Sequence, residues 1–196
     1  MEKTVENLRK NGFAVTEFDT KEAAADYLAG AISGKTIGMG GSMTMAALDV
    51  YDRLAAANTV YWHQIVPGDD TCVNADNAQV YITSANAISE EGYILNIDGR
   101  CNRVAGTLMK KEKVYFVVGQ NKLSGGFDEA LARARNVASP QNARRLNKKT
   151  PCAVNGDKCY NCSSPDRICS ALVVLWQPPF WCDSMEVVLI HEDLGY

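Results

Sequence analysis

The residues whose types and spacing point most directly to chemistry are four cysteines in the last quarter of the chain. Cys152, Cys159, Cys162 and Cys169 form the pattern C-x6-C-x2-C-x6-C within residues 151–170. Few apolar residues lie between them, so hydrophobic packing alone is not expected to order the segment. Four thiolates can hold a zinc ion or an iron–sulfur cluster, and disulfides or free thiols are the alternatives that the pattern leaves open.

A glycine-rich segment, KTIGMGGSMT at residues 35–44, is the second candidate site. Its glycines would let the backbone approach a ligand closely, and its hydroxyl groups could donate hydrogen bonds. The helix expected to follow would present free N–H groups to an anion. The segment therefore predicts a turn that binds phosphate or carboxylate, and a tight turn with a serine N-cap is the structural alternative. The candidate ligand-binding residues here are Gly38, Gly40, Gly41, Ser42 and Thr44.

Two polar segments, residues 83–92 and 96–104, each follow a predicted strand. Asn86, Asn102 and Arg103 within them are candidate anion ligands, because an arginine fork binds carboxylate or phosphate through two hydrogen bonds. A role as solvated turn residues is the alternative.

The same region contains two adjacent glutamates, Glu90 and Glu91. A carboxylate can act as a general base or as a nucleophile, so both are candidate catalytic residues. Their alternative role is also that of solvated turn residues. A basic segment at residues 144–149, RRLNKK, is either a solvated helix end or the rim of an anion site.

Composition excludes several functional classes. With 196 residues and a net charge of −3, the chain is expected to be one soluble domain without affinity for nucleic acid. No apolar run is long enough to span a membrane. The first residues, MEKTVENLRKNG, contain no apolar export signal, so a cytoplasmic location is expected. Seven cysteines in such a chain favour metal or redox use over a disulfide framework.

The elements that must position these residues alternate between strands and helices. Such alternation predicts an α/β fold with a mostly parallel sheet flanked by helices. The carboxyl ends of parallel strands meet at one edge, so the glycine turn and the polar segments should lie together. The expected strands are 13–18, 35–39, 59–62, one within 75–82, 93–97, 113–118, 171–176 and 185–191; the expected helices are 2–11, 19–28, 43–57, 127–138 and one beginning at Pro140.

The domain organisation follows from this order. Residues 1–196 are expected to form a single domain, with residues 151–170 as a cysteine-rich, metal-binding type of insertion. The two strands after the insertion flank Pro178 and Pro179, so they are predicted to pair with each other as a hairpin-like excursion or at a sheet edge.

Several strings stand out in the chain, in this order: GMGGSMT, NAISEEGYILNIDGRCNRVAG, VVGQNKL, RARNVASPQNARRL, TPCAVNGDKCYNCSSPDRIC and VVLIHEDLGY. Together they resemble the lactate-utilisation (LUD) domain family, also called the YkgG- or LutC-like family. The resemblance covers nearly the whole chain. It implies a fold of the NagB, ribose-5-phosphate isomerase and CoA-transferase type. It also implies a part in oxidising L-lactate to pyruvate beside iron–sulfur partner proteins.

The resemblance favours an iron–sulfur cluster, of the 4Fe-4S type, over zinc at the four cysteines. It also exposes one departure. The family string NIDG-x-G-NR has glycine where this chain has Cys101. If that glycine lets the backbone pass close to a ligand, Cys101 narrows the space beside Asn102 and Arg103.

Three functional classes remain open. The first is a redox accessory protein whose glycine-rich edge binds a small carboxylate, a phosphate or the cofactor of a partner. The second is an enzyme of the sugar-phosphate isomerase or CoA-transferase kind that uses Glu90 or Glu91. The third is a non-catalytic binding or regulatory module with structural zinc. A homo-oligomer also stays open.

Overall fold

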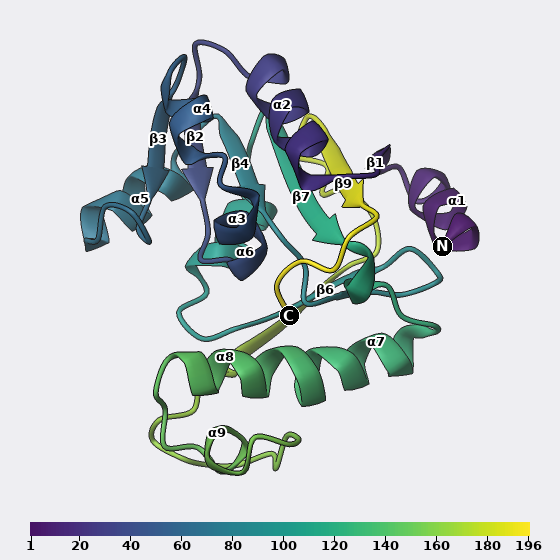
Figure 1. The fold of residues 1–196 in the computed structure, drawn as a ribbon, viewed down its shortest axis with the longest axis vertical. Helices are drawn as coiled ribbons and strands as arrows, with labels where there is room; N and C mark the ends of the chain where they lie inside the picture. The colour runs from purple at the N-terminus through teal and green to yellow at the C-terminus, as the bar shows by residue number, and fades with distance from the viewer.

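The centre of the molecule is a six-stranded sheet whose strands are all parallel (Figure 1). The computed structural model describes all residues 1–196. The sequence-based prediction of an α/β fold with a parallel sheet is confirmed. In spatial order the strands are β1 (Ala14–Phe18), β9 (Met185–Ile190), β7 (Lys113–Gly119), β4 (Val80–Thr83), β2 (Thr36–Met39) and β3 (Thr59–Trp62).

Strand β7 lies near the middle of this sheet because its residues are apolar on both faces. Val114, Phe116 and Val118 pack in one hydrophobic core, whereas Tyr115 and Val117 pack in the other. Alternate side chains of a strand point to opposite faces, so a continuous apolar run suits a strand that is covered on both sides. The sheet thereby separates two cores.

Helices cover both faces of the main sheet. On one face lie α2 (Lys21–Ala31), α3 (Met43–Leu48) and α4 (Tyr51–Ala55). The other face is covered in part by α1 (Glu2–Lys10) and α5 (Asp69–Asp76).

Two helical expectations need correction. The helix expected over residues 43–57 is divided, because Asp49 adopts a left-handed conformation with φ 52° that ends α3. Helix α5 was not expected, and the strand within residues 75–82 begins only at Val80.

A second, antiparallel sheet contains β5 (Ala87–Ile88), β6 (Ile94–Asp98) and β8 (Ala171–Leu175). The prediction that the last two strands pair with each other is wrong. Strand β8 pairs with β6, and β9 enters the main sheet between β1 and β7. All residues of β9 are buried, which suits an interior strand, whereas β8 is partly exposed and suits a sheet edge.

One long helical segment lies across the carboxyl ends of the main strands (Figure 1). It follows the short turn η1 (Gln120–Lys122) and consists of α7 (Phe127–Arg133), a π turn η2 (Ala134–Ala138) and α8 (Ser139–Arg145). Pro140 was expected to begin a separate helix. Instead the wider π turn just before it keeps the segment continuous although Pro140 donates no backbone hydrogen bond.

Two further helices lie at this end of the molecule. Helix α6 (Asn102–Leu108) follows β6, and α9 (Pro151–Asn155) begins the cysteine-rich segment on the far side of α8 from the main sheet. None of the helices combines the length and the apolar character that crossing a membrane requires.

Candidate functional site

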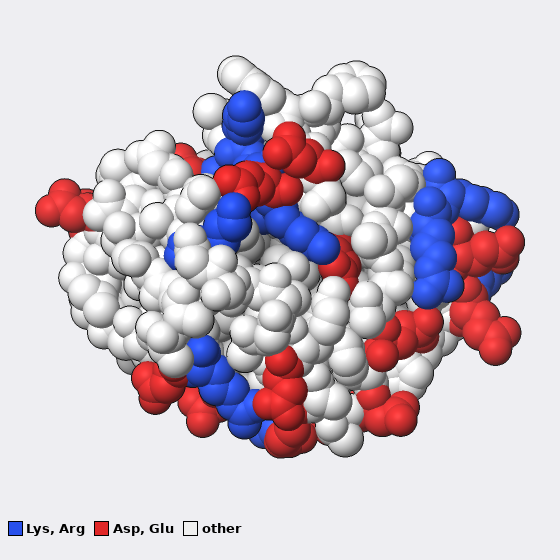
Figure 2. All heavy atoms as spheres, turned by 90° about the horizontal axis from the view of Figure 1, so that it is seen from above, with Lys and Arg blue, Asp and Glu red and all other residues white.

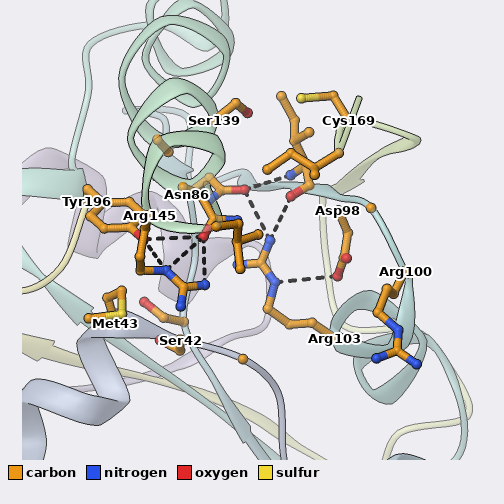
Figure 3. A pocket seen from close by; sticks show the side chains of 18 of the residues that line it. Ser42, Met43, Asn86, Asp98, Arg100, Arg103, Ser139, Arg145, Cys169 and Tyr196 are labelled. Atoms are coloured by element: carbon orange, nitrogen blue, oxygen red, sulfur yellow. Dashed lines mark hydrogen bonds and ion pairs between the residues drawn. The ribbon is translucent and has the colours of Figure 1, made fainter. Parts of the chain in front are cut away.

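A cavity of about 560 Å³ opens at the carboxyl edge of the main sheet (Figure 3). Its walls come from the glycine turn, both polar segments, helix α8 and the end of the cysteine-rich segment. The charged groups that line it are strongly unbalanced, because six are basic and one is acidic. They are Arg100, Arg103, Lys122, Arg145, Lys148, Arg167 and Asp98. Such an excess of cations in a concave site attracts anions.

Arg103 is fixed in one wall of the cavity by the start of helix α6. Its Nη2 donates to the Ile97 carbonyl at 2.8 Å and to Asn86 Oδ1 at 3.2 Å, and its Nε lies 3.5 Å from Asp98 Oδ2. Figure 3 shows these contacts converging on the guanidinium group. Asn86 in turn accepts from the Ile97 N–H at 2.7 Å. The second sheet and α6 are thereby locked together at the site.

Lys122 enters the cavity from the turn that follows β7, and its side chain is almost wholly buried. Its Nζ donates to Thr44 Oγ1 at 2.6 Å and to Ser84 Oγ at 3.0 Å. Burial, together with the charges of Arg133 and Arg103, lowers the pKa of this amine to about 7. No carboxylate is among its hydrogen-bond partners.

Three residues of helix α8, Ser139, Asn142 and Arg145, form the opposite wall, with Lys148 beyond them. Arg145 Nε donates to the Tyr196 hydroxyl at 2.7 Å and to Asn142 Oδ1 at 3.2 Å. These partners are neutral, so the charge of Arg145 is not compensated by them. Arg145 and Lys148 belong to the basic segment at residues 144–149, which ends helix α8 and also borders the cavity, so both of its interpretations stay open.

Five of the eight predicted ligand-binding residues line the cavity: Gly41, Ser42, Asn86, Asn102 and Arg103. The other three lie behind its wall, where they shape it. A Cβ on Gly38 would come within 2.0 Å of the Ala75 carbonyl oxygen, and one on Gly40 within 2.7 Å of Arg103 Cγ. These two glycines therefore permit close packing against α5 and α6, and Thr44 holds Lys122 from behind.

Ser42 is the N-cap that the structural alternative predicted, and its predicted role in ligand binding stays a prediction. Its side chain accepts a hydrogen bond from the Met45 N–H at 3.2 Å as the N-cap of α3, and it also lines the cavity. Its own N–H donates to Gln64 Oε1 at 2.7 Å, so this donor is already engaged.

Glu90 and Glu91, the predicted catalytic pair, lie outside the cavity. Glu90 forms an exposed ion pair with Lys3 at 2.6 Å. Glu91 Oε1 accepts from the Phe127 N–H at 3.3 Å at the start of α7, where a carboxylate stabilises the helix. The structure thus does not bring these carboxylates together with the other predicted site residues.

The four cysteines of the predicted metal site are divided between the cavity and the segment beyond α8. Cys169 lines the cavity. Burial raises the pKa of its thiol, and the nearby Cys159 and Cys152 thiols add to this effect. Cys152 is buried, with its sulfur 3.2 Å from Thr150 Oγ1.

These sulfurs do not form a coordination set as they stand. No group of three or more His, Cys, Asp or Glu side chains is arranged so that it could hold a metal ion. A cluster or a zinc ion at the four cysteines would require the segment to rearrange, and the cofactor stays a prediction.

Cys101, which stands where the family string has glycine, adopts a backbone conformation that favours glycine. It has φ 62° immediately before α6, a conformation that glycine adopts freely and that strains other residues. Its side chain does not line the cavity. The expected narrowing of the ligand space is therefore absent.

Sequence reasoning missed two residues that matter most at the site, Lys122 and Ser84. Ser84 lies within the polar segment 83–92 and Lys122 within the string VVGQNKL, but the sequence analysis predicted no role for either residue. His63, for which the sequence analysis predicted no role, also lines the cavity. Its Nδ1 is buried without a hydrogen-bond partner, and burial lowers the pKa of its imidazole.

Comparisons with known proteins agree with this architecture. A DUF162 family protein from Deinococcus radiodurans, known from a crystal structure, matches with a TM-score of 0.54. The two are 14% identical, over 96% of this chain and 94% of that one, so the likeness shows a shared fold. No curated protein matches the sequence. The model of the LUD domain matches residues 1–190, and the chain therefore belongs to the LUD domain family.

Proposed function

We propose that the cavity binds a small carboxylate and that the protein acts in lactate utilisation, as a redox-associated accessory or subunit in the oxidation of L-lactate to pyruvate. Membership of the LUD family supports the pathway. The observation that supports the ligand is the cavity's charge, six basic side chains against one carboxylate. Coulombic attraction in a partly enclosed site exceeds that of the same charges on an open surface.

The cations differ in how free they are to bind a ligand. Asp98 already compensates Arg103, whereas the hydrogen-bond partners of Arg145 are neutral oxygens. Lys148 forms no ion pair within 4.0 Å. A ligand carboxylate is therefore expected between the α8 wall and Lys122. The cavity exceeds the size of a three-carbon acid, so phosphates belong in the same screen.

Calorimetric titration with L-lactate, pyruvate and phosphate tests the proposal. Arg145→Gln should weaken binding of the preferred anion about tenfold, the usual effect of losing one charge-assisted hydrogen bond. Arg144→Gln is the matched control, because its neighbour Arg144 does not line the cavity and should leave affinity unchanged. Equal affinity in both variants, or no binding of any anion to the wild-type protein, would overturn the proposal.

We also propose that the four thiols of the cysteine-rich segment take up an iron–sulfur cluster or zinc. The support is that Cys169 borders the cavity while the Cys159 and Cys152 thiols lie near it. Iron, sulfide and zinc assays on anaerobically purified protein test the idea. Stoichiometric metal lost in Cys159→Ser supports it, and metal-free wild-type protein with full anion binding contradicts it.

The isomerase or CoA-transferase alternative has no support from the position of its predicted catalytic residues. It assigned the chemistry to Glu90 or Glu91, and neither side chain reaches the cavity.

A further inference from the structure

Lys122 is surrounded in a way that is unusual for a buried lysine. Buried ammonium groups are normally paired with a carboxylate, because desolvating an isolated charge is costly. Here the hydrogen-bond partners of Nζ are the hydroxyl groups of Thr44 and Ser84, and the charged neighbours are the guanidinium groups of Arg133 and Arg103. This environment favours the neutral amine.

A neutral lysine amine beside other cations is a recognised nucleophile toward carbonyl groups. With a pKa of about 7, roughly half of the Lys122 side chains carry a free lone pair at neutral pH. Lys122 and Ser84 both line the cavity, whereas Thr44 lies behind them. Lys122 therefore lies in the cavity wall, and Thr44 fixes its amine from outside the cavity.

We propose that Lys122 condenses with the carbonyl group of a small α-keto acid to form a Schiff base, with the acid's carboxylate held by the cations of the cavity. The inference rests on the proposed carboxylate site and names the class of ligand that reacts there. A keto acid has both features that the site requires, a carboxylate and an adjacent electrophilic carbon. A hydroxy acid such as L-lactate has only the first, so it binds without reacting.

The step is balanced by the groups present. The Nζ lone pair forms the C–N bond, the carbonyl oxygen takes up a proton, and the nitrogen gives one up, which yields a carbinolamine. The carbinolamine C–O bond then breaks: the hydroxyl group takes up a proton and leaves as water, the nitrogen gives up its remaining proton, and the nitrogen lone pair forms the C=N bond. Ser84 Oγ, 3.0 Å from Nζ, is placed to relay these protons. Thr44 is a positioning residue, because its hydroxyl accepts from Nζ and donates to the Leu194 carbonyl at 3.1 Å.

Trapping with sodium borohydride tests the proposal on the full-length protein. Borohydride reduces the C=N bond, so pyruvate should leave an adduct of about 72 Da on one lysine. Peptide mapping should find it on Lys122 and not on Lys111. Lys111 is an internal control in the same sample, because it is also buried with a lowered pKa but does not line the cavity. L-Lactate with borohydride should leave no adduct.

The variant Lys122→Arg keeps a positive charge but cannot form the Schiff base, and it should lose the adduct. The control Lys149→Arg, at an exposed lysine outside the cavity, should keep it. Pyruvate that binds by calorimetry but leaves no adduct, or adducts spread equally over surface lysines, would overturn the Schiff base while the carboxylate site stands. Absence of both binding and adduct would overturn the two proposals together.

Discussion

The two ends of strand β7 carry lysines in opposite electrostatic environments. Lys113, at the amino end, lies 2.6 Å from Glu186, a buried carboxylate that also accepts hydrogen bonds from Tyr27 and Thr16. Burial alone would lower the pKa of Lys113, but the hydrogen bond and charge of Glu186 outweigh it and raise that pKa. Lys122, just past the carboxyl end, has no carboxylate partner, and its pKa falls to about 7.

The two lysines lie at opposite edges of the main sheet, and the charged side chains at these two edges are arranged differently. Seen from above, the molecule shows basic and acidic side chains interspersed, with neither sign forming a continuous patch (Figure 2). The cavity at the opposite, carboxyl edge gathers basic groups with a single acid. At the amino ends Lys113 is paired with Glu186, whereas at the carboxyl ends Lys122 and Arg145 have hydrogen-bond partners that are neutral oxygens. In open α/β sheets, ligands bind outside the carboxyl ends of the strands.

The largest contrast is expected when each lysine is replaced by methionine. Lys113→Met should lower the free energy of unfolding by about 3 kcal/mol, because it leaves Glu186 buried and uncompensated. Lys122→Met should change it by less than about 1 kcal/mol at pH 7, since Ser84 and Thr44 keep a hydrogen bond with each other. Urea unfolding of both variants measures the two changes in the free energy of unfolding. Equal losses would contradict the difference between the two lysines.

The pH dependence of stability sharpens the same comparison. Lys122 has a folded pKa of about 7 and an unfolded value near 10.5. Between these values the unfolded chain binds more protons, so the Lys122 contribution to stability rises with pH, by up to about 1.4 kcal/mol per pH unit. Below pH 7 both states are protonated and the contribution is flat.

The measurement is the unfolding free energy of the wild type minus that of Lys122→Met from pH 6 to 9. The subtraction removes thiols and tyrosines that titrate in the same window. A difference that stays constant above pH 7, or that falls, would show that Lys122 is charged like Lys113.

The smallest effect is expected beside the site, at Cys101. Cys101→Gly should raise the free energy of unfolding by about 1 kcal/mol, because glycine adopts the φ of 62° without strain. Anion affinity should not change, since the side chain does not line the cavity. Thermal unfolding with and without anion measures the stability and the anion affinity of the variant. A loss of affinity would show that the Cys101 side chain contributes to anion binding.

Periodicity and turn residues predicted the sheet type and brought Gly41, Asn86 and Arg103 to one edge, because parallel strands share their carboxyl ends. They could not predict the role of Lys122. A lysine after a buried strand looks solvated in sequence, and its lack of a carboxylate partner is a property of distant residues. Glu91 misled for the converse reason, since a carboxylate that stabilises a helix start has the same local pattern as a catalytic one.

The order of the last strands was also outside the reach of local pattern. Strands β8 and β9 are neighbours in sequence, and their residues do not predict that β9 pairs with β1, at the other end of the chain. Burial on both faces distinguishes β9 only after the sheet has formed.

The most direct test of the account is an NMR titration of the lysine side chains, with the Lys122 signal identified by its absence in Lys122→Met. The account predicts that the Lys122 amine titrates near pH 7 and shifts to higher pH when a carboxylate binds, while Lys113 titrates above the ordinary lysine value. Titration of Lys122 near the ordinary value of about 10.4, unaffected by any anion, would contradict both the proposed site and its reactive amine.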